Sequence, residues 1–167
     1  AYNKLSFINK KINIKTIEKK INYKISKKQN FIEYSPLGLK YLKDILKFIK
    51  KNKGGLLIID YGYFSKKMKD TLQAIHQKKC SKVLENICKS DITYNINFYL
   101  LKKISQNFKE LDVNLTSQKN FLNNLGIQKR AEIICKNKTF SEKADIFYRL
   151  KRLINEKEMG NLFKVML

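Results

Sequence analysis

The sequence predicts an α/β fold built around a partly parallel sheet, and two observations carry this prediction. Residues 37–49 place apolar side chains at helical spacing, and the apolar run Leu56–Ile59 follows them through the pair Gly54-Gly55. A short apolar run that follows a helix through a glycine turn is typical of a parallel strand buried on both faces. With 167 residues, 43% of them apolar, the chain is long enough for one domain or for a large part of a bigger one.

The first two predicted elements are a hairpin and a helix. From Ile12 to Ile25 apolar residues alternate with lysines, and this period of two predicts an antiparallel β-hairpin. Ser35 is then a candidate N-cap, and Pro36 stands at the first helical position, where its missing N–H is not needed. The helix that follows ends at Gly54-Gly55.

The predicted strand Leu56–Ile59 ends in Asp60-Tyr61-Gly62-Tyr63, which we expect to form a turn. Ligands of open α/β sheets gather at the carboxyl ends of parallel strands, so this turn is a candidate site for chemistry. A structural role fits the same residues equally well, with Asp60 capping the turn and Gly62 allowing a bend.

The rest of the chain alternates between short helices and strands, because its apolar spacing switches repeatedly between the two periods. The expected elements are an extended piece at 70–75, a helix at 97–108, a strand at 111–115, helices at 118–125 and 128–136 separated by Gly126, a longer helix at 142–154 and a last strand at 162–167.

The formal charge of +22 raises the question of a nucleic-acid or membrane partner. Only three of the 36 basic residues are arginine, the side chain with the bidentate fork suited to phosphates and base edges. The lysines are spread from Lys4 to Lys164, so we expect no nucleic-acid partner, and a basic nucleic-acid-binding domain is the third alternative. No apolar run approaches the roughly 20 residues of a membrane span, and we expect a soluble protein.

Residues for metal or nucleophilic chemistry are scarce. The three cysteines are odd in number without CxxC spacing, which argues against disulfides and a zinc site and favours a reducing cytoplasm. His76 is the only histidine, and no GxSxG, EF-hand or HExxH pattern occurs. No two of the six glycines have the GxG spacing of nucleotide loops. The chain also begins without Met or a signal sequence, so we expect it to derive from something longer.

Several pieces of the sequence, taken in order, resemble the MidA-like proteins of bacteria and mitochondria, which are class I S-adenosylmethionine-dependent methyltransferases. The resemblance covers roughly residues 30 to 167, and the alphaproteobacterial members are the most similar. The matching pieces are Glu33-Tyr34-Ser35-Pro36 before a helix, Gly54 to Tyr63, Asp70-Thr71-Leu72-Gln73-Ala74, Asp91-Ile92-Thr93, Gln118 with Phe121-Leu122 and Leu125-Gly126-Ile127, Arg130-Ala131, Arg152-Leu153 and Met159-Gly160 to Val165.

The resemblance implies a partial Rossmann-like methyltransferase sheet with helices on both faces and an antiparallel last strand. Residues 1–32 would form a β-hairpin insertion region, and residues 33–167 the C-terminal half of the methyltransferase domain. Leu56–Ile59 would be the fifth strand, and residues 111–115 and 162–167 the final pair. The family's glycine-rich loop and ribose-binding acid lie earlier in the chain, so S-adenosylmethionine would be bound mainly by a missing N-terminal half. We therefore assign no cofactor-binding and no metal-binding residues here.

The sequence also departs from the family pattern. Where the family usually has Ala-His-Val-Asp-Phe, this chain has Tyr94-Asn95-Ile96-Asn97-Phe98. Amides replace the imidazole and the second carboxylate, so neither position exchanges a proton near neutral pH. A further histidine of the family falls on Lys78. We therefore name no catalytic residue.

The resemblance implies transfer of a methyl group to a protein arginine nitrogen, with a respiratory complex I subunit as the substrate in the mitochondrial branch. Carboxylates would stabilise the cationic guanidinium, and Glu33 and Asp60 are the best candidates. The other candidate substrate-binding residues, each also compatible with a structural role, are Tyr61, Gly62, Tyr63, Asp91, Thr93 and Gln118. A non-catalytic protein-binding or complex-assembly module is the second alternative.

Overall fold

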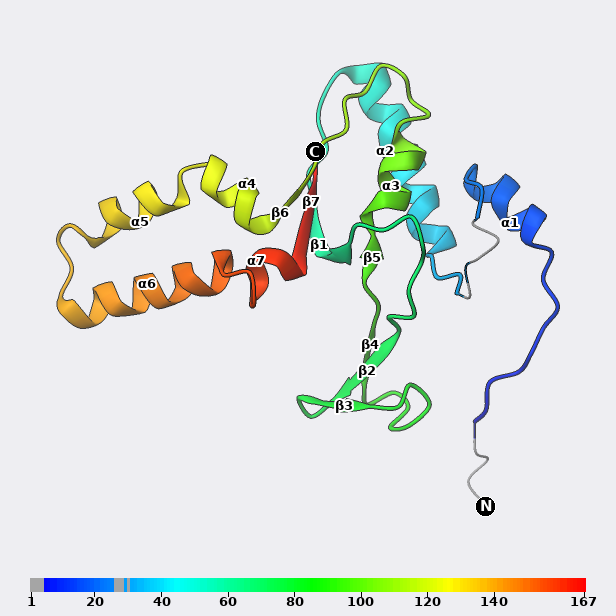
Figure 1. Cartoon of the computed structure of the whole chain (residues 1–167), viewed down its shortest axis with the longest axis horizontal. Helices are drawn as coiled ribbons and strands as arrows, with labels where there is room; N and C mark the ends of the chain where they lie inside the picture. The colour runs from blue at the N-terminus through cyan, green and yellow to red at the C-terminus, as the bar shows by residue number, and fades with distance from the viewer. Residues whose placement is uncertain (1–4, 26–28, 30) are drawn as a thin grey trace.

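The computed structural model describes residues 5–25, 29 and 31–167. A four-stranded sheet lies at its centre, with two helices beside it, a separate three-stranded sheet on one side and an arm of helices on another (Figure 1). This mixed α/β architecture confirms the predicted fold class.

The central sheet has the order β5-β1-β7-β6 and combines both strand directions. β1 (Ile58–Tyr63) pairs in parallel with β5 (Ile96–Asn97), and the last strand β7 (Phe163–Met166) runs antiparallel to both β1 and β6 (Leu115–Ser117). The antiparallel last strand was predicted and is confirmed.

Two strand boundaries differ from the prediction. β1 begins at Ile58 and runs through residues 60–63, which we expected to form a turn, because Asp60 and Tyr61 pair with β7. The rings of Tyr61 and Phe163 lie 4.1 Å apart on this ladder. The strand predicted at 111–115 begins only at its last residue, although the backbones of Asn114 and Leu167 already exchange two hydrogen bonds of 2.9 and 3.0 Å.

Helices α2 (Pro36–Asn52) and α3 (Phe98–Ser105) lie side by side along the sheet (Figure 1). A side chain caps each helix as the sequence predicts for α2: Ser35 Oγ accepts the N–H of Gly38, and Asn97 Oδ1 accepts that of Leu100. The buried core between helices and sheet contains Leu39, Leu42, Leu46, Phe98, Leu100, Ile104 and Met166.

The two faces of the sheet are covered unequally. Val165 and Met166 are neighbours on β7 and therefore point to opposite faces, and both are buried, at 0% and 3% exposure. On β1, by contrast, Ile59 is 42% and Tyr61 44% exposed. The prediction of a strand buried on both faces is therefore wrong for β1, because these two side chains, which share one face of the strand, are both exposed.

The predicted hairpin at residues 12–25 is also wrong. The segment contains helix α1 (Ile14–Ile21), with Asn13 as N-cap and Asn22 in the left-handed conformation after its last turn. Ile14, Ile17 and Ile21 follow the helical spacing i, i+3, i+7, which the alternating pattern had obscured. Ile21 is buried in the core. Parts of the predicted insertion region, namely residues 1–4, 26–28 and 30, lie outside the described residues.

The three-stranded sheet projects away from the central sheet (Figure 1). β2 (Gln73–His76) pairs antiparallel with β3 (Lys79–Ser81) and with β4 (Asp91–Thr93). Gln77 and Lys78 join β2 to β3 with φ of 48° and 63°, the backbone of a two-residue hairpin turn. β2 begins within the extended piece predicted at 70–75.

The helical arm contains α4 (Gln118–Asn124), α5 (Ile127–Cys135), α6 (Phe140–Ile154) and α7 (Met159–Leu162). Gly126, at φ 74°, separates α4 from α5, as predicted. α6 starts with a capping box: the hydroxyl oxygen of Thr139 accepts the N–H of Glu142, and the carboxylate of Glu142 accepts the N–H of Thr139. Within the part of the chain that the structure describes, no helix is long and apolar enough to cross a membrane.

Candidate functional site

A hydrogen-bond network joins the segment before α2 to the segment before β2. The carboxylate of Glu33 accepts the N–H of Thr71 at 2.9 Å through Oε2 and the hydroxyl of Thr71 through Oε1. The same hydroxyl oxygen accepts the N–H of Asn95 at 2.9 Å. Because Asn95 precedes β5, which pairs with the carboxyl end of β1, three distant segments meet at this edge of the sheet.

Tyr63, the last residue of β1, lies buried beside this network. Its hydroxyl accepts the N–H of Lys69 at 3.0 Å, and Lys69 Nζ lies 5.2 Å from the centroid of its ring. Burial raises the pKa of Tyr63, and the negative charge of Glu33 raises it as well, while hydrogen bonds with the Lys69 backbone and the Asn97 side chain lower it. The net direction is upward, so Tyr63 is a protonated phenol at neutral pH.

An apolar cavity of about 230 Å³ adjoins the network. Aliphatic side chains of α2, α3 and the central sheet form most of its wall, and Glu33, Tyr94 and Asn97 belong to its polar lining. A mostly apolar hollow with a few polar groups is the usual form of a small-ligand site.

The structure brings Glu33, Gly62 and Tyr63 together out of the predicted set. Gly62 is required by packing, because a Cβ atom there would lie 2.4 Å from the carbonyl oxygen of Ile96 and 2.6 Å from the ring of Phe98. No larger residue fits between β1, β5 and the first turn of α3.

Asp60 and Tyr61 lie earlier on β1 and do not join the network. The carboxylate of Asp60 accepts the N–H of its own neighbour Tyr61 at 2.7 Å, and Tyr61 packs on Phe163. Both side chains are exposed. Of the two candidate carboxylates, only Glu33 therefore belongs to the network.

Asp91 and Thr93 lie on β4, in the three-stranded sheet, and both are exposed. The hydroxyl of Thr93 accepts a hydrogen bond of 3.2 Å from the Gln73 amide of β2. Asp91 and Thr93 therefore belong to the three-stranded sheet and not to the network of Glu33, Thr71 and Asn95.

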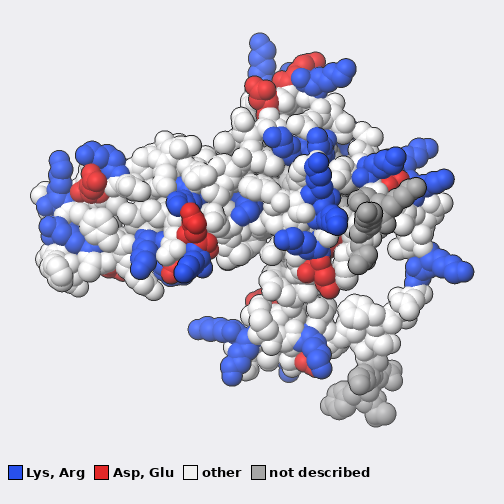
Figure 2. All heavy atoms as spheres, in the orientation of Figure 1, with Lys and Arg blue, Asp and Glu red and all other residues white. Residues whose placement is uncertain are grey.

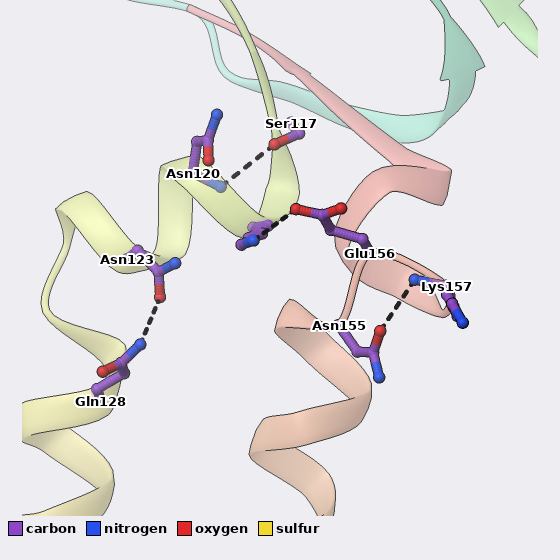
Figure 3. A network of polar contacts seen from close by, with 8 residues as sticks. Ser117, Asn120, Asn123, Gln128, Asn155, Glu156 and Lys157 are labelled. Atoms are coloured by element: carbon purple, nitrogen blue, oxygen red, sulfur yellow. Dashed lines mark hydrogen bonds and ion pairs between the residues drawn. The ribbon is translucent and has the colours of Figure 1, made fainter.

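Gln118 lies in the helical arm. It is buried, and its Nε2 donates to the carbonyl oxygen of Leu153 at 2.9 Å, which ties α4 to the end of α6. Next to it, the ion pair between Lys119 and Glu156, at 2.6 Å, links α4 to the connection between α6 and α7 (Figure 3). Gln118 therefore holds the arm together.

Sequence reasoning did not select Thr71, Asn95 and Asn97 as site residues. Asn97 carried a usable signal, since an amide directly before the apolar run at 98–101 is an N-cap signature. Thr71 lies in the piece 70–74 that resembles the family, but no local pattern marks the roles of Thr71 and Asn95, which depend on contacts with Glu33 and with each other across 38 and 24 residues.

In the described residues, no glycine-containing turn leads from a strand of the central sheet into a helix. The two helices that directly follow a strand, α3 and α4, are capped by the side chains of Asn97 and Ser117, so a backbone N–H that could bind a ligand is already used in each. Gly126 separates two helices rather than a strand and a helix. The described part of the chain also contains no group of three His, Cys, Asp or Glu residues that could hold a metal ion.

Comparison with solved structures shows the same fold. An uncharacterized protein from Burkholderia thailandensis aligns with a TM-score of 0.62 and 25% identity over 72% of this chain and 35% of that chain. A second protein from the same organism, bound to S-adenosyl-homocysteine, aligns with a TM-score of 0.58 and 23% identity over 74% of this chain and 35% of that chain.

Two curated proteins are similar to this chain in sequence. The mitochondrial protein arginine methyltransferase NDUFAF7 of Danio rerio is 28% identical over 116 residues, which are 70% of this chain and 27% of the relative. The Xenopus tropicalis protein of the same name is 24% identical over 137 residues, 81% of this chain and 31% of the relative. The chain thus spans about a third of the length of these proteins.

The family whose model matches residues 3–116 is described as "Putative S-adenosyl-L-methionine-dependent methyltransferase". This match covers more than half of the chain. The chain therefore belongs to this family of S-adenosyl-L-methionine-dependent methyltransferases.

Proposed function

We propose that this protein transfers a methyl group from S-adenosylmethionine to an arginine nitrogen of another protein, and that Glu33 helps to hold the arginine. The family supports methyl transfer, and the names of the two curated relatives support arginine as the acceptor. The observation that carries the proposal is the carboxylate of Glu33, fixed by Thr71 beside an apolar cavity between α2, α3 and the central sheet.

The chemistry of the network suits a guanidinium group. A carboxylate has about four lone-pair sites, and Thr71 uses two of those on Glu33, so the remainder can accept N–H groups of a substrate arginine. Bonds between Arg and a carboxylate are short, directional and often bidentate. Glu33 would thereby orient the nitrogen and stabilise the cationic product, while the apolar cavity wall excludes water.

The remaining roles are narrower. Tyr63, with its raised pKa, is a hydrogen-bonding group and not a general base. A respiratory complex I subunit as the substrate and a cytoplasmic location stay predictions; Cys80, Cys88 and Cys135 are all free thiols, which is consistent with a reducing compartment.

A second candidate function is that of a protein-binding or assembly module. The exposed aromatic side chains Phe140 and Tyr148 on α6 favour it, since large exposed apolar side chains mark many protein interfaces. One protein can have both functions. A measurement of methyl transfer therefore tests the first function without excluding the second.

The test uses the full-length protein, S-adenosylmethionine with a deuterated methyl group, and a soluble protein extract as acceptor. Mass spectrometry of digests should find deuterated methylarginine. Glu33→Gln should lower its rate of formation about 100-fold, because an amide cannot supply the negative charge. The matched control is Glu110→Gln, whose carboxylate is exposed and pairs with Lys50 at 3.0 Å. Labelled lysine in place of arginine, or equal rates for Glu33→Gln and wild type, would contradict the proposal.

A further inference from the structure

A second cavity, of about 290 Å³, lies at the junction between the segment before α2 and the segment that leads into β2. Its size is close to the lower end of small-ligand pockets, roughly 300 Å³. It shares Glu33, Tyr34 and Tyr94 with the apolar cavity, so the two hollows adjoin. Its full lining is Phe31, Ile32, Glu33, Tyr34, Asp70, Leu72 and Tyr94.

The composition of this lining suits a cation. Three of the seven residues are aromatic, and the faces of such rings attract Lys, Arg and other cations. Two more, Glu33 and Asp70, are carboxylates. Two carboxylates in one lining are unusual in a chain with 36 basic and only 14 acidic residues, and on the face drawn in Figure 2 basic side chains clearly outnumber acidic ones.

The two carboxylates differ in the number of hydrogen bonds that they already accept. Glu33 already accepts two hydrogen bonds from Thr71. Asp70 directly precedes Thr71 in the chain, so these bonds also fix its backbone next to Glu33. Among the described residues, the side chain of Asp70 makes no hydrogen bond and no ion pair, and it is exposed. Asp70 is therefore the more available acceptor in this cavity.

We propose that this second cavity binds the guanidinium side chain of the protein substrate, with Asp70 as the accepting carboxylate and Tyr94 as the aromatic face. Ile32 and Leu72 supply aliphatic surface for the methylene groups that precede a guanidinium. The inference rests on the proposed function, which makes arginine the acceptor and gives Glu33 a part in holding it, and it adds Asp70 and Tyr94 as residues that bind the same guanidinium group. A planar guanidinium both stacks on aromatic rings and forks to carboxylates, so it fits this lining better than an ammonium group.

The test measures binding without turnover. Saturation-transfer NMR with the full-length protein would use ethylguanidinium as the probe and neutral ethylurea, of similar shape, as its control. Ethylguanidinium should bind and ethylurea should not, because only the former carries the charge that the carboxylates and rings attract.

Variants assign the binding to the cavity. Asp70→Asn should weaken ethylguanidinium binding about ten-fold, the loss of one charge-assisted hydrogen bond. Tyr94→Leu should weaken it roughly three- to five-fold, whereas Tyr94→Phe, which keeps the ring, should retain it. Asp145→Asn is the matched control, because Asp145 lies on α6 and pairs with Arg149.

The binding results and the methylation result test two different claims. Equal binding of ethylurea and ethylguanidinium, or unchanged binding by Asp70→Asn, would overturn the assignment of the cavity. Failure of the wild-type protein to methylate arginine would instead overturn the proposed function and leave the binding result standing. Far-UV circular dichroism on each variant separates loss of the cavity from loss of the fold.

Discussion

Thr71 donates both its backbone N–H and its hydroxyl to the carboxylate of Glu33, although 38 residues separate the two in the chain. The hydroxyl also accepts the N–H of Asn95. One threonine therefore connects the start of α2, the approach to β2 and the start of β5. Its replacement should loosen the packing of all three segments.

We expect Thr71→Val to destabilise the protein by about 1–3 kcal/mol, because valine has the same shape but leaves the part-buried Asn95 N–H without its acceptor. Urea unfolding of the full-length protein measures this. Thr93→Val is the control, since the exposed hydroxyl of Thr93 bonds only to the Gln73 side chain, and it should change stability by no more than about 0.5 kcal/mol. Equal effects of the two substitutions would contradict a central role for Thr71.

Gly62→Ala should be strongly destabilising. The added Cβ would lie 2.4 Å from a backbone oxygen that cannot move aside without breaking the pairing of β1 with β5. Overpacking of this kind costs about 1–3 kcal/mol. Gly54→Ala, with nothing within 4 Å of the new Cβ, should leave the thermal midpoint nearly unchanged. A Gly62→Ala protein as stable as the Gly54→Ala protein would show that β5 does not lie where the structure places it.

The stability of α6 should depend on pH below 5. Hydrogen bonds with Lys138 first, and then with the backbone and side chain of Thr139, lower the pKa of Glu142 to about 2. A lowered pKa gives stability that is fully present above the unfolded value of 4.5 and is lost as pH falls toward 2.

The comparison of wild type with Glu142→Gln isolates this effect. The excess stability of the wild type, measured by urea unfolding, should be largest above pH 5 and should shrink toward zero near pH 2. Glu132→Gln, which removes an exposed pair with Lys129, controls for loss of one negative charge. A constant difference across this pH range would show that the capping box is absent in solution.

Tyr63 predicts a dependence in the alkaline range. Burial, as the largest cause, raises its pKa above 10.0, so the folded state holds the phenolic proton more tightly than the unfolded state does. The sign is therefore a loss of stability as pH rises through 10.0, where the unfolded chain ionises first. Tyr63→Phe should reduce this loss, and Tyr148→Phe, at an exposed position of α6, should not. Unfolding measured at pH 9 and at pH 11 provides the comparison.

Local signals in the sequence predicted much of the fold. Ser35 and Pro36 fix the start of α2, and Gly126 fixes the break between α4 and α5, because caps and glycine turns act within a few residues. The antiparallel last strand followed from the family resemblance, and β7 confirms it. The hairpin at 12–25 failed because sparse isoleucines among lysines satisfy both a period of two and a period of 3.6.

Non-local pairing decided the rest. Asp60 and Tyr61 belong to a strand only because β7, about 100 residues later, pairs with them. The Glu33 network could be predicted in part, since Glu33 and Tyr63 were selected, but no local pattern marks Thr71 as the partner. Gln118 was selected by its place in a family motif, and its bond to Leu153 depends on how α4 folds against α6.

The tip of the three-stranded sheet has a consequence for the wall of the second cavity. Gln77 and Lys78 both carry side chains in the left-handed backbone region, where glycine or asparagine is the easier occupant. The tip is therefore the place where β2 and β3 should separate first, and exchange of their amide hydrogens should start there. Since β2 begins only two residues beyond Thr71, a looser tip would slacken the strand that leads back to Leu72 and Asp70, and an Asn-Gly tip would stiffen it.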